Sequence, residues 1–152
     1  MIHYINIKLH AGFEQTVQSV IEALKVEGFG IISEINMHEK LKEKLGVDFR
    51  KYKILGACSP LHAYKALQKD DKIGTLLPCN IIIQELADDE VEVATVDPVA
   101  SMLAVENSAM VDMAKEIREM ITRVIRSLKH KGHVGLNSGR NGDSMAKVGS
   151  GR

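Results

Sequence analysis

The sequence predicts an α+β domain in which a mostly antiparallel sheet carries two long helices on one face. Three observations support this prediction. Segments with strand patterns outnumber the long helical ones, two long segments repeat apolar residues at helical spacing, and short turns separate successive strands. Apart from two short helices, the order along the chain is strand, helix, four strands, helix. That order favours antiparallel pairing with both long helices packed together on the same side.

The first half of the chain supplies two strands and two helices. Residues 2–9 alternate apolar and polar side chains, as a half-buried strand requires. Residues 12–27 then repeat apolar side chains at helical spacing, and alternation returns in residues 30–37. Residues 39–45 predict a short helix that ends at Gly46, where glycine suits a left-handed helix stop.

The second half supplies the remaining strands. Residues 51–57 predict the third strand and residues 60–69 a short helix. The apolar run Ile81-Ile82-Ile83 predicts that the fourth strand, residues 79–86, is buried on both faces. Asp88-Asp89 forms a turn into residues 91–96, so we expect the last two strands to form a hairpin.

The last predicted helix spans residues 107–129 and has one continuous apolar face. The composition changes beyond it, because residues 130–152 hold six of the 12 glycines in the chain. We therefore expect one domain over residues 1–129. A flexible tail rich in Gly, Ser and Asn, either native or residual vector sequence, follows over residues 130–152.

The overall composition argues against some classes of function, namely nucleic-acid binding and insertion into a membrane. The chain has 152 residues, and its 20 Lys and Arg balance 20 Asp and Glu, so no general positive field attracts nucleic acid. The N-terminus lacks the basic start and apolar run of a signal peptide, and no apolar run reaches the length of a membrane span. We expect a soluble, cytoplasmic protein without nucleic-acid or membrane partners. Its two cysteines are then expected to be reduced thiols.

Several separated blocks of the sequence occur in a characteristic order and spacing, namely residues 28–35, 41–49, 52–58, 73–74, 76–80 and 96–98. In this arrangement the chain resembles the family named domain of unknown function 302 (DUF302), over residues 1–129. The resemblance implies a small α+β domain that is usually dimeric and has no established reaction. The chain departs from the family pattern at Ser59-Pro60, where relatives commonly carry Asn-Pro, although Ser can cap a helix as Asn does.

Cys58 is the first candidate functional residue. It ends the third predicted strand just before Ser59 and Pro60, which suit the cap and first turn of a helix. The partial positive charge of a helix N-terminus favours a thiolate, so Cys58 is a candidate catalytic nucleophile with His62 as its candidate base. The alternative is that Cys58 is a small buried side chain and that His62 caps the helix or lies on the surface.

Cys79 and Asn80 are further candidates, because they open the fourth strand after Pro78. If the third and fourth strands are neighbours, Cys58, Ser59, Cys79 and Asn80 surround one pocket for a small anionic or thiol-reactive ligand. Buried strand packing is the alternative for Cys79 as well. The sequence has no Cys-x-x-Cys or His-Glu-x-x-His spacing, so we expect no metal site, and it identifies no cofactor.

These observations lead to three hypotheses of function. The first is a dimeric protein that binds a small ligand near the two cysteines. The second is a thiol-dependent enzyme or redox sensor that uses Cys58, and the third is a structural or interaction protein. We expect a homodimer because a sheet covered by helices on one side leaves its other face or an edge to be protected.

Overall fold

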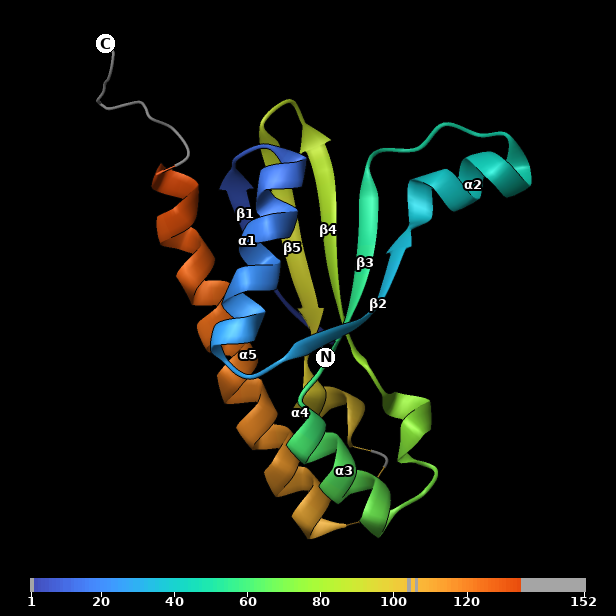
Figure 1. The fold of residues 1–152 in the computed structure, drawn as a ribbon, viewed down its shortest axis with the longest axis vertical. Coiled ribbons are helices and arrows are strands. Elements are labelled where there is room, and N and C mark those ends of the chain that lie inside the picture. The colour runs from blue at the N-terminus through green and yellow to red at the C-terminus, as the bar shows by residue number, and fades with distance from the viewer. Residues whose placement is uncertain (1, 104, 106, 135–152) are drawn as a thin grey trace.

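The computed structural model describes residues 2–103, 105 and 107–134. It confirms the predicted α+β class and shows a five-stranded sheet in the order β1-β5-β4-β3-β2, with every neighbouring pair antiparallel (Figure 1). The elements are β1 Tyr4–His10, α1 Phe13–Val26, β2 Gly30–Asn36, α2 Met37–Leu45, β3 Tyr52–Cys58, α3 Pro60–Lys69, η1 Ile73–Leu76, β4 Cys79–Ala87, β5 Glu90–Val96, α4 Pro98–Ser101 and α5 Ser108–Val134.

The observed elements match the predicted ones in type and order, and their bounds differ by at most two residues except at the end of α5. That helix continues to Val134, beyond the predicted end at residue 129. The short helices η1 and α4 were not predicted from the sequence, because each is a single turn of four residues without a periodic pattern. The rest of the predicted tail, residues 135–152, lies outside the described residues.

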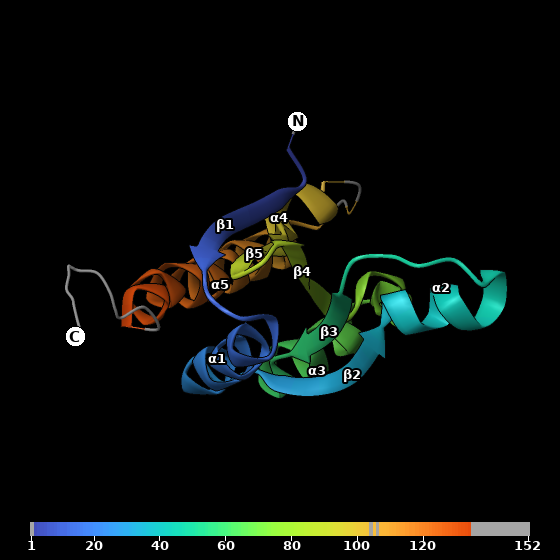
Figure 2. The same ribbon diagram turned by 90° about the horizontal axis from the view of Figure 1, so that it is seen from above.

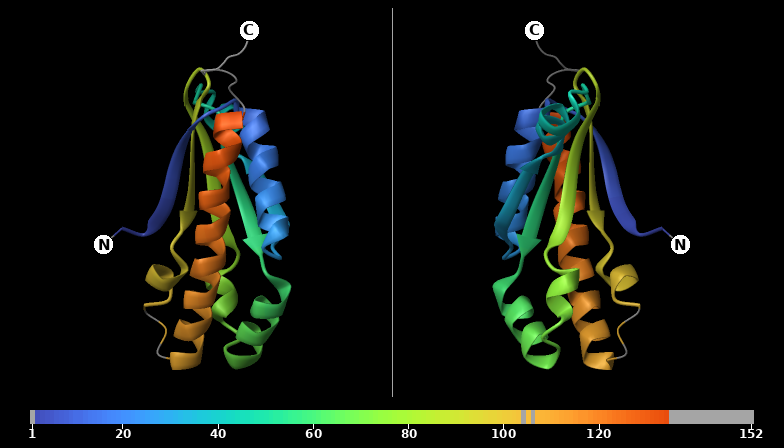
Figure 3. Two further views of the ribbon diagram at one scale, coloured as in Figure 1. Left: turned by 90° about the vertical axis from the view of Figure 1, so that its left-hand side faces the viewer. Right: turned by 90° about the vertical axis from the view of Figure 1, so that its right-hand side faces the viewer.

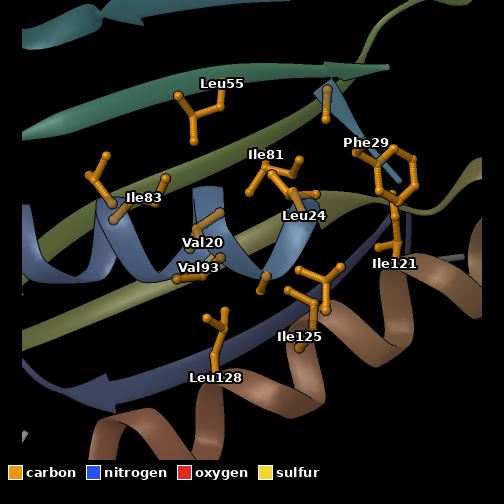
Figure 4. Packing of buried hydrophobic residues seen from close by; sticks show 14 of the residues in the cluster. Val20, Leu24, Phe29, Leu55, Ile81, Ile83, Val93, Ile121, Ile125 and Leu128 are labelled. Carbon is orange, nitrogen blue, oxygen red and sulfur yellow. The ribbon is translucent and has the colours of Figure 1, made fainter. Parts of the chain in front are cut away.

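Both long helices lie on the same face of the curved sheet, as Figures 2 and 3 show. The main core fills the space between these helices and the sheet. It combines Val20 and Leu24 of α1 with apolar side chains of the central strands and of α5 (Figure 4). Leu24, Leu55, Ile83, Val93 and Leu128 have no exposed surface. The alternation of β4 and β5 thus aims one set of side chains at the helices.

The prediction that β4 is buried on both faces was wrong. Ile81 and Ile83 face the helices and are buried, but Ile82 points to the opposite face and is partly exposed. That face carries polar groups instead, since Asn6 and Gln84 both donate hydrogen bonds to the Glu92 carboxylate at 2.6 and 2.9 Å. A run of apolar residues does not by itself show whether a strand is covered on one face or on both faces of the sheet.

The α2 helix extends away from the sheet between β2 and β3 (Figure 1). None of its nine residues is buried. The helix ends at Gly46, which has the predicted left-handed conformation with φ of 70°. Residues 32–49, which run from β2 through α2 to the loop before β3, contain no buried side chain and are called the arm below.

No helix within the described residues is long and apolar enough to cross a membrane.

Candidate functional site

A cavity of about 260 Å³ lies beyond the end of the sheet, where α3, α4 and the N-terminal part of α5 gather (Figure 1). Its walls come from the ends of β3 and β4, from α3 and η1, and from α4 and α5. Most of the lining is apolar, and it includes Ala66, Ile73, Leu77, Met102, Met110, Met113 and Ala114. The inner part of this wall is a second, smaller core cluster, in which Ala66, Ile73 and Met110 are buried.

The structure brings the candidate residues together at this cavity. Cys58, Ser59, His62, Cys79 and Asn80 all line it. The register of the sheet explains the juxtaposition, because Ala57 of β3 pairs with Cys79 of β4, so that β3 ends where β4 begins. Asn80 is exposed and lies at the rim, whereas Ser59 is buried with 9% of its surface exposed.

Gly56 allows the two strands to come together at this point. A β-carbon on Gly56 would lie 2.7 Å from Pro78 Cγ and would overlap the Ser33 hydroxyl. Pro78 precedes β4 and lines the cavity, so the absence of a side chain at Gly56 lets the proline ring pack directly on β3.

The two cysteines are free thiols. Burial raises the pKa of Cys58, which is opposite to the lowering that a helix N-terminus favours. Burial, and then the nearby Cys58, raise the pKa of Cys79 to about 11. Both thiols are therefore protonated near neutral pH, and their environment favours neutral contact groups over reactive thiolates.

Helix α3 begins as predicted, with Ser59 at the N-cap position and Pro60 in the first turn. The Ser59 side chain makes no cap hydrogen bond to the backbone. Its hydroxyl is instead 2.7 Å from His62 Nδ1, and His62 Nε2 is 3.0 Å from Glu116 Oε1 on α5. His62 thus contacts Ser59 and Glu116, and the structure gives it no hydrogen bond to Cys58, the nucleophile with which the sequence paired it.

The Ser59–His62 spacing could have indicated this contact, since residues three apart at a helix start lie on one face. Glu116 had no such signal, because it lies 54 residues beyond His62 and reaches it only through the packing of α5. The apolar methionine wall of the cavity was likewise interpreted from the sequence only as core filling.

No group of three or more His, Cys, Asp or Glu side chains that could hold a metal ion occurs in the described part of the chain. The polar side chains that line the cavity are two thiols, one imidazole, one amide, and the hydroxyls of Ser59, Thr75 and Ser101.

Comparison with known proteins identifies the family. The family described as Domain of unknown function DUF302 matches residues 5–128, and no curated protein matches the chain. The fold is similar to the crystal structure of an uncharacterized conserved DUF302 protein from Bacillus stearothermophilus, with a TM-score of 0.76 and 24% sequence identity. That similarity covers 83% of this chain and 98% of the other. Since the family match spans most of the sequence, the resemblance seen in its blocks is confirmed, and the chain belongs to the DUF302 family.

Proposed function

We propose that this protein binds a small, largely apolar molecule with one polar end in the cavity beyond β3 and β4. The lining supports the proposal, because it is apolar over most of its area and carries polar side chains at Cys58, Ser59 and Asn80. The two further hydroxyls, of Thr75 and Ser101, already donate to backbone carbonyls. Its volume of about 260 Å³ lies just below the range of roughly 300 to 1,000 Å³ typical of sites for drug-sized ligands, so a smaller molecule fits.

The polar end of the ligand lies beside the start of α3 in this proposal. None of the described lining residues is Lys or Arg. The predicted anionic character of the ligand would therefore depend on the amide groups of the first turn of α3, which favour negative charge. The raised pKa values of both thiols give less support to a thiol-reactive ligand or to a thiol-dependent enzyme.

Methionine methyl NMR tests this proposal at single residues. Of the seven methionines in the chain, Met102, Met110 and Met113 line the cavity, whereas Met37 lies on the distant α2 helix. Titration of methyl-labelled protein with hexanol and with hexanoate should give saturable shifts at the three lining methyls and none at Met37. Comparison of the alcohol with the acid shows whether the site prefers an anion.

Two matched variants of α5 provide the control. Ala114 is buried in the cavity wall, so Ala114→Leu should fill the space and weaken binding at least tenfold, an effect of about 1.4 kcal/mol. Ala109→Leu lies on the exposed side of the same helix and should leave binding unchanged. Absence of saturable shifts with both probes would refute a small-molecule site.

We also propose a homodimer in which a second copy covers the arm, residues 32–49. Isolated helices shorter than about 12 residues are marginal in water, yet α2 has nine residues and none of them is buried. The arm also exposes five large apolar side chains, Ile32, Ile35, Leu45, Val47 and Phe49. Burial of these groups in a partner would stabilise both the helix and the association.

Light scattering on the eluting protein at micromolar concentration tests the dimer, for which we expect twice the chain mass of 16.8 kDa. Leu45→Asp should shift the mass to that of a single chain. Leu86→Asp, at an exposed apolar position on β4 outside the arm, should leave the dimer intact. A wild-type mass of one chain would exclude this assembly.

The cytoplasmic location stays a prediction, which the two free thiols favour.

A further inference from the structure

A hydrogen-bonded chain of three side chains, which ligand binding alone does not require, starts at the cavity wall with Ser59 and His62 and ends at Glu116 outside it. Ser59 Oγ lies 2.7 Å from His62 Nδ1, and His62 Nε2 lies 3.0 Å from Glu116 Oε1. Ser59 is buried, and the His62 side chain is 20% exposed. Glu116 is more open, with 67% of its side chain exposed. The three residues thus run from the cavity to the surface.

The hydrogen-bonding capacities of these groups fix the direction of the protons. A carboxylate only accepts, so Nε2 of His62 donates to Glu116. In a neutral imidazole the other nitrogen then accepts, and the Ser59 hydroxyl donates to Nδ1. Because the hydroxyl proton is already directed at a base, Ser59 Oγ has the arrangement of an activated nucleophile, with Glu116 orienting that base.

We propose that this chain is a catalytic centre in which Ser59 hydrolyses small apolar esters. The inference rests on the proposed ligand function, because the same cavity would hold the substrate. The apolar acyl or aryl part would lie against the methionine wall, and the ester carbonyl would lie at Ser59.

The reaction proceeds in two balanced steps. In the first, Ser59 Oγ forms a bond to the carbonyl carbon, its proton moves to His62 Nδ1, and the bond to the leaving alcohol breaks as that alcohol takes the proton. In the second, water attacks the acyl-serine and gives a proton to His62. The carboxylic acid leaves, and the proton returns to Ser59 Oγ. No oxidant, reductant or metal enters either step.

The position of Ser59 at the start of α3 suits the charge that develops in this reaction. Pro60, the first residue of α3, has no N–H, so the N–H groups that the Ser59 side chain leaves uncapped are those of Leu61 and His62. Those groups and the helix dipole stabilise negative charge next to the N-cap residue, as an oxyanion requires.

Hydrolysis of 4-nitrophenyl acetate, butyrate and hexanoate tests the proposal. The intact protein should hydrolyse at least one of these esters above the buffer rate, and Ser59→Ala and His62→Gln should each lower kcat/KM at least about 100-fold. Ser127→Ala, on α5 and outside the cavity lining, serves as the matched serine control and should retain full activity. A phosphonofluoridate should label the peptide that contains Ser59, as detected by mass spectrometry.

Glu116 acts through His62 and is a positioning residue. Glu116→Gln should lower kcat about tenfold with KM unchanged, because the amide oxygen still accepts from Nε2 but no longer stabilises an imidazolium by charge. Glu119→Gln, one turn further along the exposed side of α5, should change neither constant.

The hexanol titration separates the two proposals. Suppose that hexanol binds the intact protein and the Ser59→Ala variant equally well. The catalytic centre is then refuted, and the binding site stands, if the intact protein hydrolyses no ester. The same holds if the Ser59→Ala variant retains the wild-type kcat/KM. Labelling at Cys58 in place of Ser59 would also refute it. If neither hexanol nor hexanoate binds, the binding proposal fails by its own test, and the catalytic centre that rests on it fails with it.

Discussion

The alkaline stability of the protein should depend on Cys79, which the structure places at the start of β4 against the main core. Burial and the neighbouring Cys58 raise the pKa of Cys79 from 9.0 to about 11. The thiolate is therefore less favoured in the native state than in the unfolded chain. By linkage, the stabilising effect of the protonated thiol is complete below pH 9 and is lost as the pH rises through about 11.

The magnitude follows from the two pKa values. A difference of two units corresponds to about 2.7 kcal/mol well above pH 11, and about half of this loss is reached by pH 10. Since Cys79 keeps partial contact with solvent, we expect a loss on the order of 1 kcal/mol in the free energy of unfolding at pH 10.

Urea unfolding of the wild type and of Cys79→Ala, from about pH 8 to about pH 11 with a reductant present, measures this loss. The variant should be less stable at pH 8, because it lacks the partly buried thiol group. Lysines and tyrosines also titrate in this range in both proteins, so the decisive quantity is the difference between the two curves. That difference should shrink by roughly 1 kcal/mol between pH 8 and pH 10. If the free energies of unfolding of the two proteins change in parallel over the whole pH range, the Cys79 thiol is not desolvated in the way that the structure indicates.

Two further predictions concern packing, and urea midpoints check both. Gly56→Ala should destabilise the fold by about 1 to 3 kcal/mol because its β-carbon would lie 2.7 Å from Pro78 Cγ, whereas Gly74→Ala has open space and should be nearly neutral. Equal effects of the two glycine variants would contradict the close approach at Gly56. Leu24→Ala should cost about 2 to 5 kcal/mol because Leu24 is fully buried, while Val26→Ala at the exposed end of the same helix should cost little. A small effect at Leu24 would place it outside the core.

The elements of the fold could be predicted because each has a local cause. Alternation specified β1 and β5, helical spacing specified α1 and α5, and Pro60 marked the start of α3. Whether one face or both faces of the sheet are covered could not be predicted, as the partly exposed Ile82 shows. Its apolar side chain suits either a buried or a half-exposed strand, and only the position of the helices decides between them.

The candidate site was predicted in part. Cys58, Ser59, Cys79 and Asn80 were expected to meet if two strands were neighbours, and they line one cavity. The partner of His62 was not predicted, and neither was the direction in which the thiol pKa values shift. Both depend on groups that arrive from other elements, since Glu116 comes from α5 and desolvation reflects everything packed around a thiol.

The sequence by itself determined the kinds of element, their order and the family, because these depend on residue patterns within short windows and on the spacing of the family blocks. The tertiary structure decided that β1 pairs with β5, that β4 is covered by helices on one face only, and that α3 and α5 meet across the cavity. It also joined Ser59, His62 and Glu116 into one hydrogen-bonded chain. The physical reason is that contacts between residues far apart in the chain depend on how whole surfaces pack, which no local pattern encodes.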